Sequence, residues 1–251
     1  MGATLNASAA DQQGLLVLQA YDSRLDQLDR QRGRLPEHEQ IASNSARLAE
    51  LRDLLIAAET EESDVAREQA KAEADVDQVR ARAARDRERL DRGQVGSPRE
   101  LESLQHEIGS LARRQSDLED VVLEIMERRE SGQARLVELR AGTAQRQALL
   151  ATAESSRDEQ TSVIDAEAAE VGEKRKALAA TLPADLLALY ERLRAHSNGV
   201  GAAAIRQRRC EGCRLELGAT DVQRFRNAPD DAVLRCEECG RILVRTAESG
   251  L

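Results

Sequence analysis

Four cysteines, arranged as two pairs, have the spacing that most clearly predicts chemistry in this sequence. Cys210 and Cys213 form one Cys-x-x-Cys unit, and Cys236 and Cys239 form a second unit further along the chain. Two intervening residues let one tight turn direct both sulfurs at the same point, and two facing turns supply the tetrahedral four-sulfur shell that Zn²⁺ accepts. We therefore predict one structural Zn²⁺ bound by all four cysteines.

Two other chemistries are compatible with paired cysteines. A redox-active Cys-x-x-Cys usually occurs as a single unit beside a βαβ pattern, and an iron centre of the rubredoxin type uses the same four thiolates. A catalytic zinc is disfavoured, because four thiolates leave no coordination position open for water.

Arginines near the cysteines have two interpretations. A zinc ion with four thiolates carries a net negative charge, which could be balanced by Arg208, Arg209, Arg214, Arg235 and Arg241. The alternative is a local patch that binds the phosphates of RNA or DNA, formed by Arg206, Arg208, Arg209, Arg224 and Arg226. From residue 200 onward, nine arginines face eight acidic residues, so the region is not basic in bulk and only a local patch could bind nucleic acid.

Two aromatic residues are ambiguous in the same way. Phe225 lies between Arg224 and Arg226, an arrangement that resembles a base-stacking ring flanked by phosphate contacts. It is more often simply the core aromatic of a small domain, and the core role is the favoured one. For Tyr190, packing at the junction between the helical region and the cysteine-rich region is the favoured role.

The elements that position the cysteines are short. Residues 203–205, 233–234 and 242–244 are β-prone, and Gly240 directly follows the second pair, where a left-handed backbone is expected. We predict a small β-rich C4 zinc ribbon over residues 199–247. A core of this size could hardly fold without its metal.

The rest of the chain has the composition of long helices. Its 251 residues include two Tyr, one Phe and no Trp, and a third of them are charged. A sequence dominated by Ala, Glu, Lys, Leu and Arg is typical of coiled coils. This composition argues against a barrel, a sandwich or a doubly wound α/β enzyme.

Two heptad series of apolar residues predict a helical hairpin. One series extends over residues 48–90 and the other over residues 101–178. Between them, residues 93–97 are rich in turn formers, and Ser97-Pro98 with Glu100 has the pattern of a capping box at a helix start. We predict an antiparallel coiled-coil hairpin over residues 11–182; a compact bundle or a parallel dimer is the alternative.

Three other features complete the predicted organisation. Pro36 and a change of heptad phase predict a break near residues 33–42. Leu182-Pro183 ends the second arm, and a junction helix is expected over residues 183–198. The first ten residues are small and polar, and we expect them to be frayed.

The sequence has few signs of catalysis or membrane insertion. It contains no P-loop, dinucleotide-binding, nucleophile-elbow or zinc-protease motif, so we predict a protein that is not an enzyme and has no small-molecule substrate. His38, His106 and His196 are isolated and expected at the surface. No secretory signal or membrane span is evident, so a cytoplasmic protein without membrane contact is expected.

Residues 183–245 resemble the bacterial C4-type zinc ribbon family whose members carry a long N-terminal coiled-coil hairpin. The resemblance depends on Leu182-Pro183-Ala184-Asp185-Leu186-Leu187, on both cysteine pairs and on the run Cys239-Gly240-Arg241-Ile242-Leu243; residues 97–105 also resemble the family's hairpin tip. It implies a zinc-stabilised ribbon and a role in nucleic-acid or protein binding. Arg214 departs from the pattern, because many zinc ribbons place Gly after this cysteine; we expect a looser turn with all ligands retained.

The leading hypothesis is a zinc-binding adaptor. The ribbon would engage nucleic acid or a transcription-related partner, and the coiled-coil hairpin would contact proteins. The first alternative is a purely protein–protein scaffold or chaperone in which the ribbon is a structural cap. The second is a thiol-responsive switch, because oxidation would eject the metal.

Overall fold

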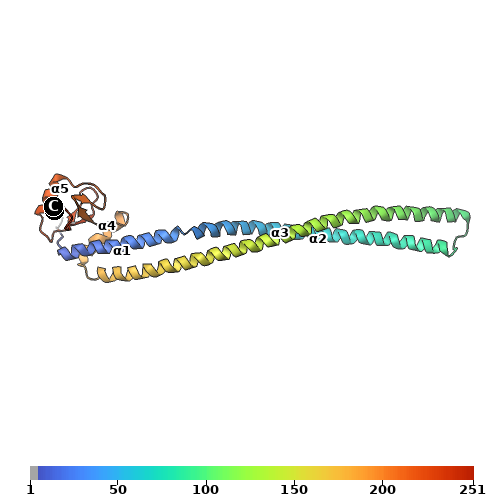
Figure 1. Ribbon diagram of the computed structural model, residues 1–251, viewed down its shortest axis with the longest axis horizontal. Coiled ribbons are helices and arrows are strands. Elements are labelled where there is room, and N and C mark those ends of the chain that lie inside the picture. Colours follow the sequence, from blue (N-terminus) through green and yellow to red (C-terminus); the bar gives the residue numbers. More distant parts are fainter. Residues whose placement is uncertain (1–4) are drawn as a thin grey trace. The chain divides into compact units, whose positions relative to one another are not determined.

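The computed structural model describes residues 5–251, most of which are helical (Figure 1). The helices are α1 (Ala9–Gly33), α2 (Pro36–Asp91), α3 (Pro98–Ala179), α4 (Ala184–His196) and α5 (Ala219–Asn227). The strands are β1 (Ala202–Arg206), β2 (Arg209–Cys210), β3 (Leu234–Arg235) and β4 (Ile242–Val244).

The chain divides into two compact units. One comprises Glu39–Glu154, and the other combines Met1–His38 with Ser155–Leu251. The sequence predicts other boundaries, with domains at residues 11–182, 183–198 and 199–247, and these boundaries stay a prediction. The predicted fold class, a long helical hairpin with a small strand-containing C-terminal region, is confirmed.

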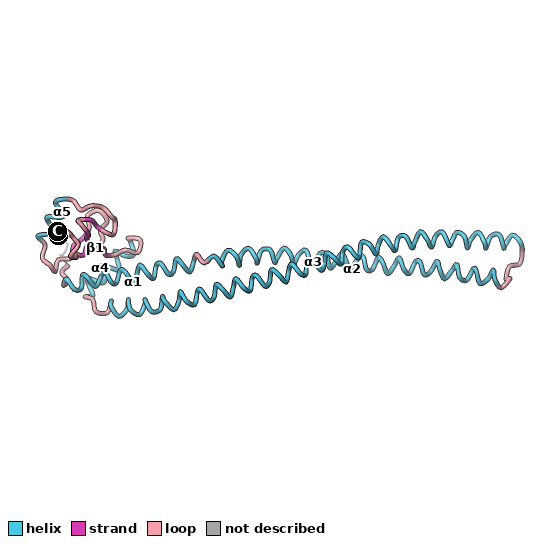
Figure 2. The backbone as a smooth tube through the Cα atoms, in the orientation of Figure 1, coloured by secondary structure: helices cyan, strands magenta, loops and turns pink. Residues whose placement is uncertain are grey.

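Within Glu39–Glu154, α2 and α3 run antiparallel (Figure 2). The positions of the predicted heptads form the buried stripe of α2: Leu48, Leu51, Ala58, Ala72, Val76 and Ala83. The opposing stripe of α3 buries Leu104, Ile125, Leu136, Thr143 and Ala153. The two stripes contain alanines as well as larger apolar residues, and their side chains pack between the two helices along the seam.

The connection between α2 and α3 has the chemistry that the sequence predicts. The backbone N–H of Glu100 donates to Ser97 Oγ over 3.3 Å, and Glu100 Oε2 accepts from the N–H of Gly96 over 2.9 Å. Glu100 also pairs with Arg89 across the turn. These bonds satisfy backbone donors at the start of α3 that have no partner within the helix.

The beginning of the described chain is ordered, so the prediction of frayed residues is wrong for residues 5–10. Ser8 caps α1 by accepting from the N–H of Asp11. Leu5–Ala7 pairs antiparallel with residues 231–233 through a bridge between Asn6 and Ala232. A strand partner far away in sequence thus orders this segment. Residues 1–4 lie outside the described residues.

The ribbon is a four-stranded sheet in the order β2-β1-β4-β3, with β1 and β4 parallel and the other pairs antiparallel. The expected strands at residues 203–205 and 242–244 are present, and the strand expected at 233–234 lies one residue later, as β3. Helix α5, which lies between the two cysteine pairs, was not predicted from the sequence.

The sheet has a different core on each side of its strands. Ala202, Ile242 and Val244 pack with apolar residues of α1 and α4, notably Leu18 and Leu186. Ala203, Ile205 and Leu243 point the other way, as alternating strand residues do, and pack with Phe225 and Leu217. The ribbon therefore shares its first core with the helices beside it.

The described helices include none that is long and apolar enough to cross a membrane.

Candidate metal centre

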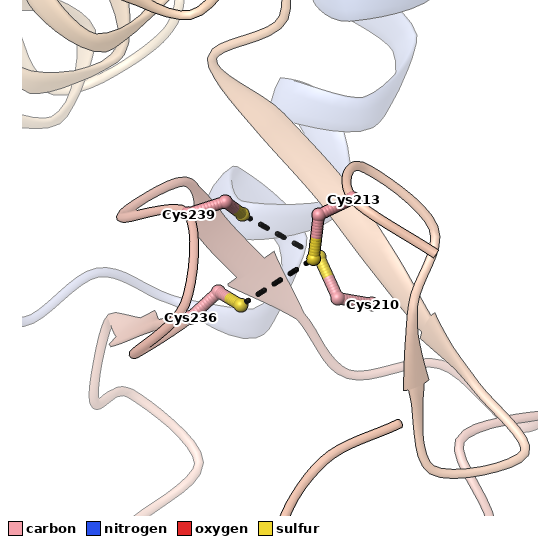
Figure 3. Close-up of side chains that lie close together, drawn as sticks. All are labelled: Cys210, Cys213, Cys236 and Cys239. Atoms are coloured by element: carbon pink, nitrogen blue, oxygen red, sulfur yellow. Dashed lines mark hydrogen bonds between the residues drawn. The ribbon is translucent and has the colours of Figure 1, made fainter. Parts of the chain in front are cut away.

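The four cysteine thiols converge at one point, which the two Cys-x-x-Cys turns enclose (Figure 3). Their sulfurs all lie within 4.8 Å of one another. Cys210 Sγ and Cys239 Sγ are 3.8 Å apart, and Cys213 Sγ and Cys236 Sγ are 3.9 Å apart. A tetrahedron with Zn–S bonds of about 2.3 Å has edges of about 3.8 Å, so the four sulfurs fit one Zn²⁺.

The same distances exclude disulfides, because a disulfide needs sulfurs about 2.05 Å apart; all four cysteines are free. The donor set of four soft sulfurs in a tetrahedron is that of a structural zinc. When bound, the ion cross-links the two turns and has no open position for water or substrate.

The two turns have the same backbone geometry. The N–H of Arg214 donates to the carbonyl of Cys210 over 2.7 Å, and the N–H of Gly240 donates to that of Cys236 over 2.9 Å. Arg214 has φ of 64° and Gly240 has φ of 70°. Arg214 therefore adopts the left-handed conformation that the second turn assigns to glycine, at a steric cost that glycine avoids.

Burial and local hydrogen bonds separate the pKa values of the thiols. Burial raises the pKa of Cys210 to about 12 and also raises the pKa of Cys236. Burial also acts on Cys239 and would raise its pKa, but hydrogen bonding from the backbone and side chain of Arg241 and from the thiols of Cys236 and Cys213 together outweighs burial and lowers the pKa to about 7. Zinc must displace the protons, since only thiolates bind it.

Two arginines hold the second turn in place. Arg241 donates from Nε to the carbonyl of Val200 over 3.0 Å and from Nη2 to that of Ser197 over 2.9 Å. Arg235 donates from Nε to the carbonyl of Gly240 over 2.9 Å. These bonds connect the zinc turn to the end of α4 and put positive charge beside the thiols.

The predicted nucleic-acid residues lie on separate elements, and several already have intramolecular partners. Arg206 pairs with Glu248 over 2.6 Å, and Arg208 donates to the carbonyl of Gly250. Arg206 and Arg209 are opposite one another in the β1–β2 pair.

The remaining two arginines of that set are on α5. Arg224 pairs with Asp221 over 3.1 Å and with Glu237 over 2.8 Å. Arg226 is exposed, and no acidic residue in the described part of the chain pairs with it.

The ring of Phe225 is in the core of the ribbon. Only 1% of the residue is exposed, and the guanidinium of Arg224 lies over the ring, 5.0 Å from its centroid. The predicted base-stacking role is therefore wrong for this conformation, because no ring face is open to a nucleotide. The core role, which the sequence favours, agrees with this burial.

Tyr190 is also buried, as the junction role predicts. Its hydroxyl donates to Asp22 Oδ2 over 2.6 Å. Asp22 is 1% exposed and also accepts from Nε of Arg175 over 2.9 Å, while Nε of Arg194 is 3.5 Å away. Glu191 in turn pairs with Arg175.

This charged cluster was not predicted, although the sequence contains a signal for it. Asp22 is four residues after Leu18 and three before Leu25, so it occupies an apolar position of the stripe. An acid at such a position needs a buried cation and hydrogen-bond donors. Arg175 interrupts the stripe of α3 in the same way.

The histidines add no second metal site. The ring of His38 contacts the carbonyl of Arg32, and the ring of His196 contacts that of Arg192. Over residues 5–251, the four cysteines are the one group of side chains placed to hold a metal ion.

Comparisons with known proteins agree with this geometry. Residues 18–198 match the family described as the CT398-like coiled coil hairpin domain, and residues 209–243 match the C4-type zinc ribbon domain. A protein of Mycobacterium tuberculosis is 39% identical over 246 residues, which is 96% of this chain and 98% of that one. A protein of Mycobacterium leprae is 30% identical, covering 88% and 94% of the two chains.

Two solved structures have the same fold. One, from Mycobacterium smegmatis, is 33% identical with a TM-score of 0.83 and covers 96% of this chain and all of that chain. CT398 from Chlamydia trachomatis is 20% identical with a TM-score of 0.68, covering 94% and 98%. At that identity the likeness concerns the fold alone.

Proposed function

The chain belongs to the family that joins a CT398-like coiled-coil hairpin to a C4-type zinc ribbon, and from this premise we propose a non-enzymatic adaptor that binds other macromolecules. One observation carries the proposal: four converging thiols fill the coordination shell of the metal. Such a zinc stabilises a small domain and offers no site for chemistry. The proposed metal ligands are Cys210, Cys213, Cys236 and Cys239.

The two parts of the adaptor would have different tasks. The coiled-coil hairpin offers long, charged helix surfaces for protein partners, and the ribbon would engage nucleic acid or a transcription-related protein. The proposed compartment is the cytoplasm, where free thiols remain available for zinc.

Nucleic-acid binding would depend on arginines without acidic partners. Arg209 and Arg226 are exposed and have no ion pair within residues 5–251. Phe225 is removed from the proposed set because its ring is buried. The pairing of Arg206 and Arg224 with acids favours the second candidate, a protein–protein scaffold in which the ribbon is a structural cap.

A salt titration separates these candidates. Zinc-loaded full-length protein is titrated with mixed-sequence single-stranded RNA and duplex DNA at low and at physiological salt. Phosphate binding weakens steeply as salt rises, because condensed counterions are released. Affinity that falls with salt, and falls again in Arg209→Glu with Arg226→Glu, would support the nucleic-acid function.

The control is Arg206→Glu, which reverses a charge that Glu248 already neutralises. Absence of binding at both salt concentrations would reject the nucleic-acid function and leave the scaffold. Zinc content, measured in every variant, separates a lost contact from a lost ribbon.

A further inference from the structure

A groove of about 620 Å³ lies between α4, α5 and β3, within the unit that contains the ribbon. We call it the ribbon groove. Its floor is apolar and consists of Leu5, Leu189, Phe225, Val233 and Leu234. The metal centre described above does not use this surface, although Glu237 on its rim is next to Cys236 in the sequence.

The ribbon groove follows a sheet edge. β3 is the last strand in the sheet order. Arg235 is opposite Ile242 in β4, and the N–H of the next residue, Cys236, donates inward to the carbonyl of Arg241 over 3.0 Å. Because peptide groups alternate in direction along an antiparallel strand, the N–H and carbonyl of Arg235 point to the outer edge.

The outer edge of the sheet already pairs with an extended segment at Val233, two residues before Arg235. The N–H of Val233 donates to the carbonyl of Leu5 over 3.1 Å, and the carbonyl of Asp231 accepts from the N–H of Ala7 over 2.7 Å. Val233 and Arg235 present their peptide groups on the same side, since strand geometry repeats every two residues. Backbone pairing of this kind is therefore compatible with the local geometry.

Two of the three arginines on the rim lack acidic partners. The third, Arg224, is paired with Glu237. The Nε of Arg235 donates to a carbonyl instead of a carboxylate, and Arg192 is exposed with no ion pair among residues 5–251. Asp185 is the other acid of the rim. The rim thus holds three guanidiniums and two carboxylates, and two of the guanidiniums are available to a ligand.

We propose that the ribbon groove binds an extended acidic segment of a partner protein. The segment lies extended beyond the Leu5–Ala7 pairing, hydrogen-bonds with the outward peptide group of Arg235 in β3 and places its carboxylates against Arg192 and Arg235. Its alternate apolar side chains lie on Leu189 and Val233. This inference rests on the adaptor function and specifies its partner. A peptide fits better than a nucleic acid, because the floor has no exposed aromatic ring on which a base could stack.

The test uses the zinc-loaded full-length protein and two short labelled peptides, one alternating glutamate with valine and the other alternating lysine with valine. The acidic peptide should bind and the basic one should not. Arg192→Glu should weaken acidic-peptide binding by about tenfold or more, because it places a carboxylate against the ligand.

Arg30→Glu is the matched control, since it makes the same charge change on α1 at an exposed residue that does not line the groove. It should leave the peptide affinity unchanged. Hydrogen exchange supplies an independent readout: the amide of Arg235 should exchange more slowly with peptide bound, as strand addition requires.

Equal affinity for the two peptides, an affinity that Arg192→Glu does not change, or an unprotected Arg235 amide would each overturn the proposal. Single-stranded RNA that binds at Arg192 in place of the peptide would also overturn it, while leaving the adaptor function intact. Failure of the adaptor function itself would appear as an absence of any macromolecular binding in the salt titration as well.

Discussion

Arg214 is a residue in the conformation of a glycine. Its φ of 64° matches the 70° of Gly240 at the equivalent place in the other zinc turn, and a side chain costs about 1–2 kcal/mol there. Arg214→Gly should therefore stabilise the zinc-loaded protein by about 0.5–1 kcal/mol, once the greater freedom of glycine in the unfolded chain is subtracted. Urea unfolding monitored by circular dichroism measures the change.

The matched control is Gly240→Ala, which introduces the same conformational cost into the second turn and should lower stability. A less stable Arg214→Gly variant would show that the arginine side chain contributes contacts that outweigh its backbone conformation.

Asp22 is the residue on which the charged cluster of the ribbon-bearing unit depends. It is 1% exposed and binds both Tyr190 and Arg175. Asp22→Ala removes the buried carboxylate from both groups, although Arg175 keeps Glu191 and Tyr190 keeps Gln19 as partners. The free energy of unfolding should fall by about 2–3 kcal/mol, below the cost for a wholly buried pair because Arg175 is partly exposed.

Asp29→Ala, an exposed substitution on the same helix, serves as the reference and should change stability by less than about 0.5 kcal/mol. If both variants unfold at the same urea concentration, the buried cluster contributes nothing to stability.

At the scale of elements, individual thiols of the two zinc turns differ in how firmly the folded ribbon holds their protons. Burial raises the pKa of Cys210 to about 12 in the folded ribbon, so zinc must displace a proton from this thiol over the whole neutral range. The pKa of Cys239 is lowered to about 7, so this thiol binds a proton only below that pH. Zinc must displace every proton that the metal-free state holds.

Zinc affinity should therefore fall as the pH falls, by up to about tenfold per pH unit for each proton displaced. Because the ribbon is expected to unfold without its metal, the four thiols of the metal-free state titrate near the ordinary cysteine pKa of about 8.5, and the slope should steepen toward four protons below that pH. Competition with a chromogenic chelator between about pH 5 and 9 measures this slope. A slope that does not steepen below about pH 8.5 would contradict the displacement of four thiol protons by zinc.

At the scale of the whole molecule, the zinc supports more than its own turns. Ile242 and Val244 of the ribbon share a core with Leu15 and Leu18 of α1. Removal of zinc with a strong chelator should unfold the ribbon, since so small a core depends on its metal. Removal of zinc should also speed amide exchange in α1, because that helix would lose part of its shared core.

Hydrogen exchange distinguishes the two units. Faster exchange is expected over residues 202–244 and in the first half of α1, with little change in Glu39–Glu154, which has its own apolar seam. Unchanged exchange in α1 after zinc removal would show that its packing does not need the ribbon. Re-addition of zinc should restore the original pattern.

The sequence by itself determined the features that repeat or that lie close together in the chain. Heptads predicted the buried stripe from Leu48 to Ala83, because helical periodicity is a local property. Ser97 and Glu100 predicted the start of α3, because capping acts over three residues. The cysteine spacing predicted the metal centre, because each turn orients its own two sulfurs.

Tertiary structure alone decided the features that depend on distant residues. Phe225 could stack on a base or fill a core, and only the convergence of β1, β4 and α5 buried its ring. Asn6 gained a strand partner more than two hundred residues away. Asp22 became a buried charge because Arg175 came from another helix to meet it. Composition and periodicity indicate which secondary structure a segment prefers. The burial of a side chain depends on which segments pack together, and only the assembled core decides this.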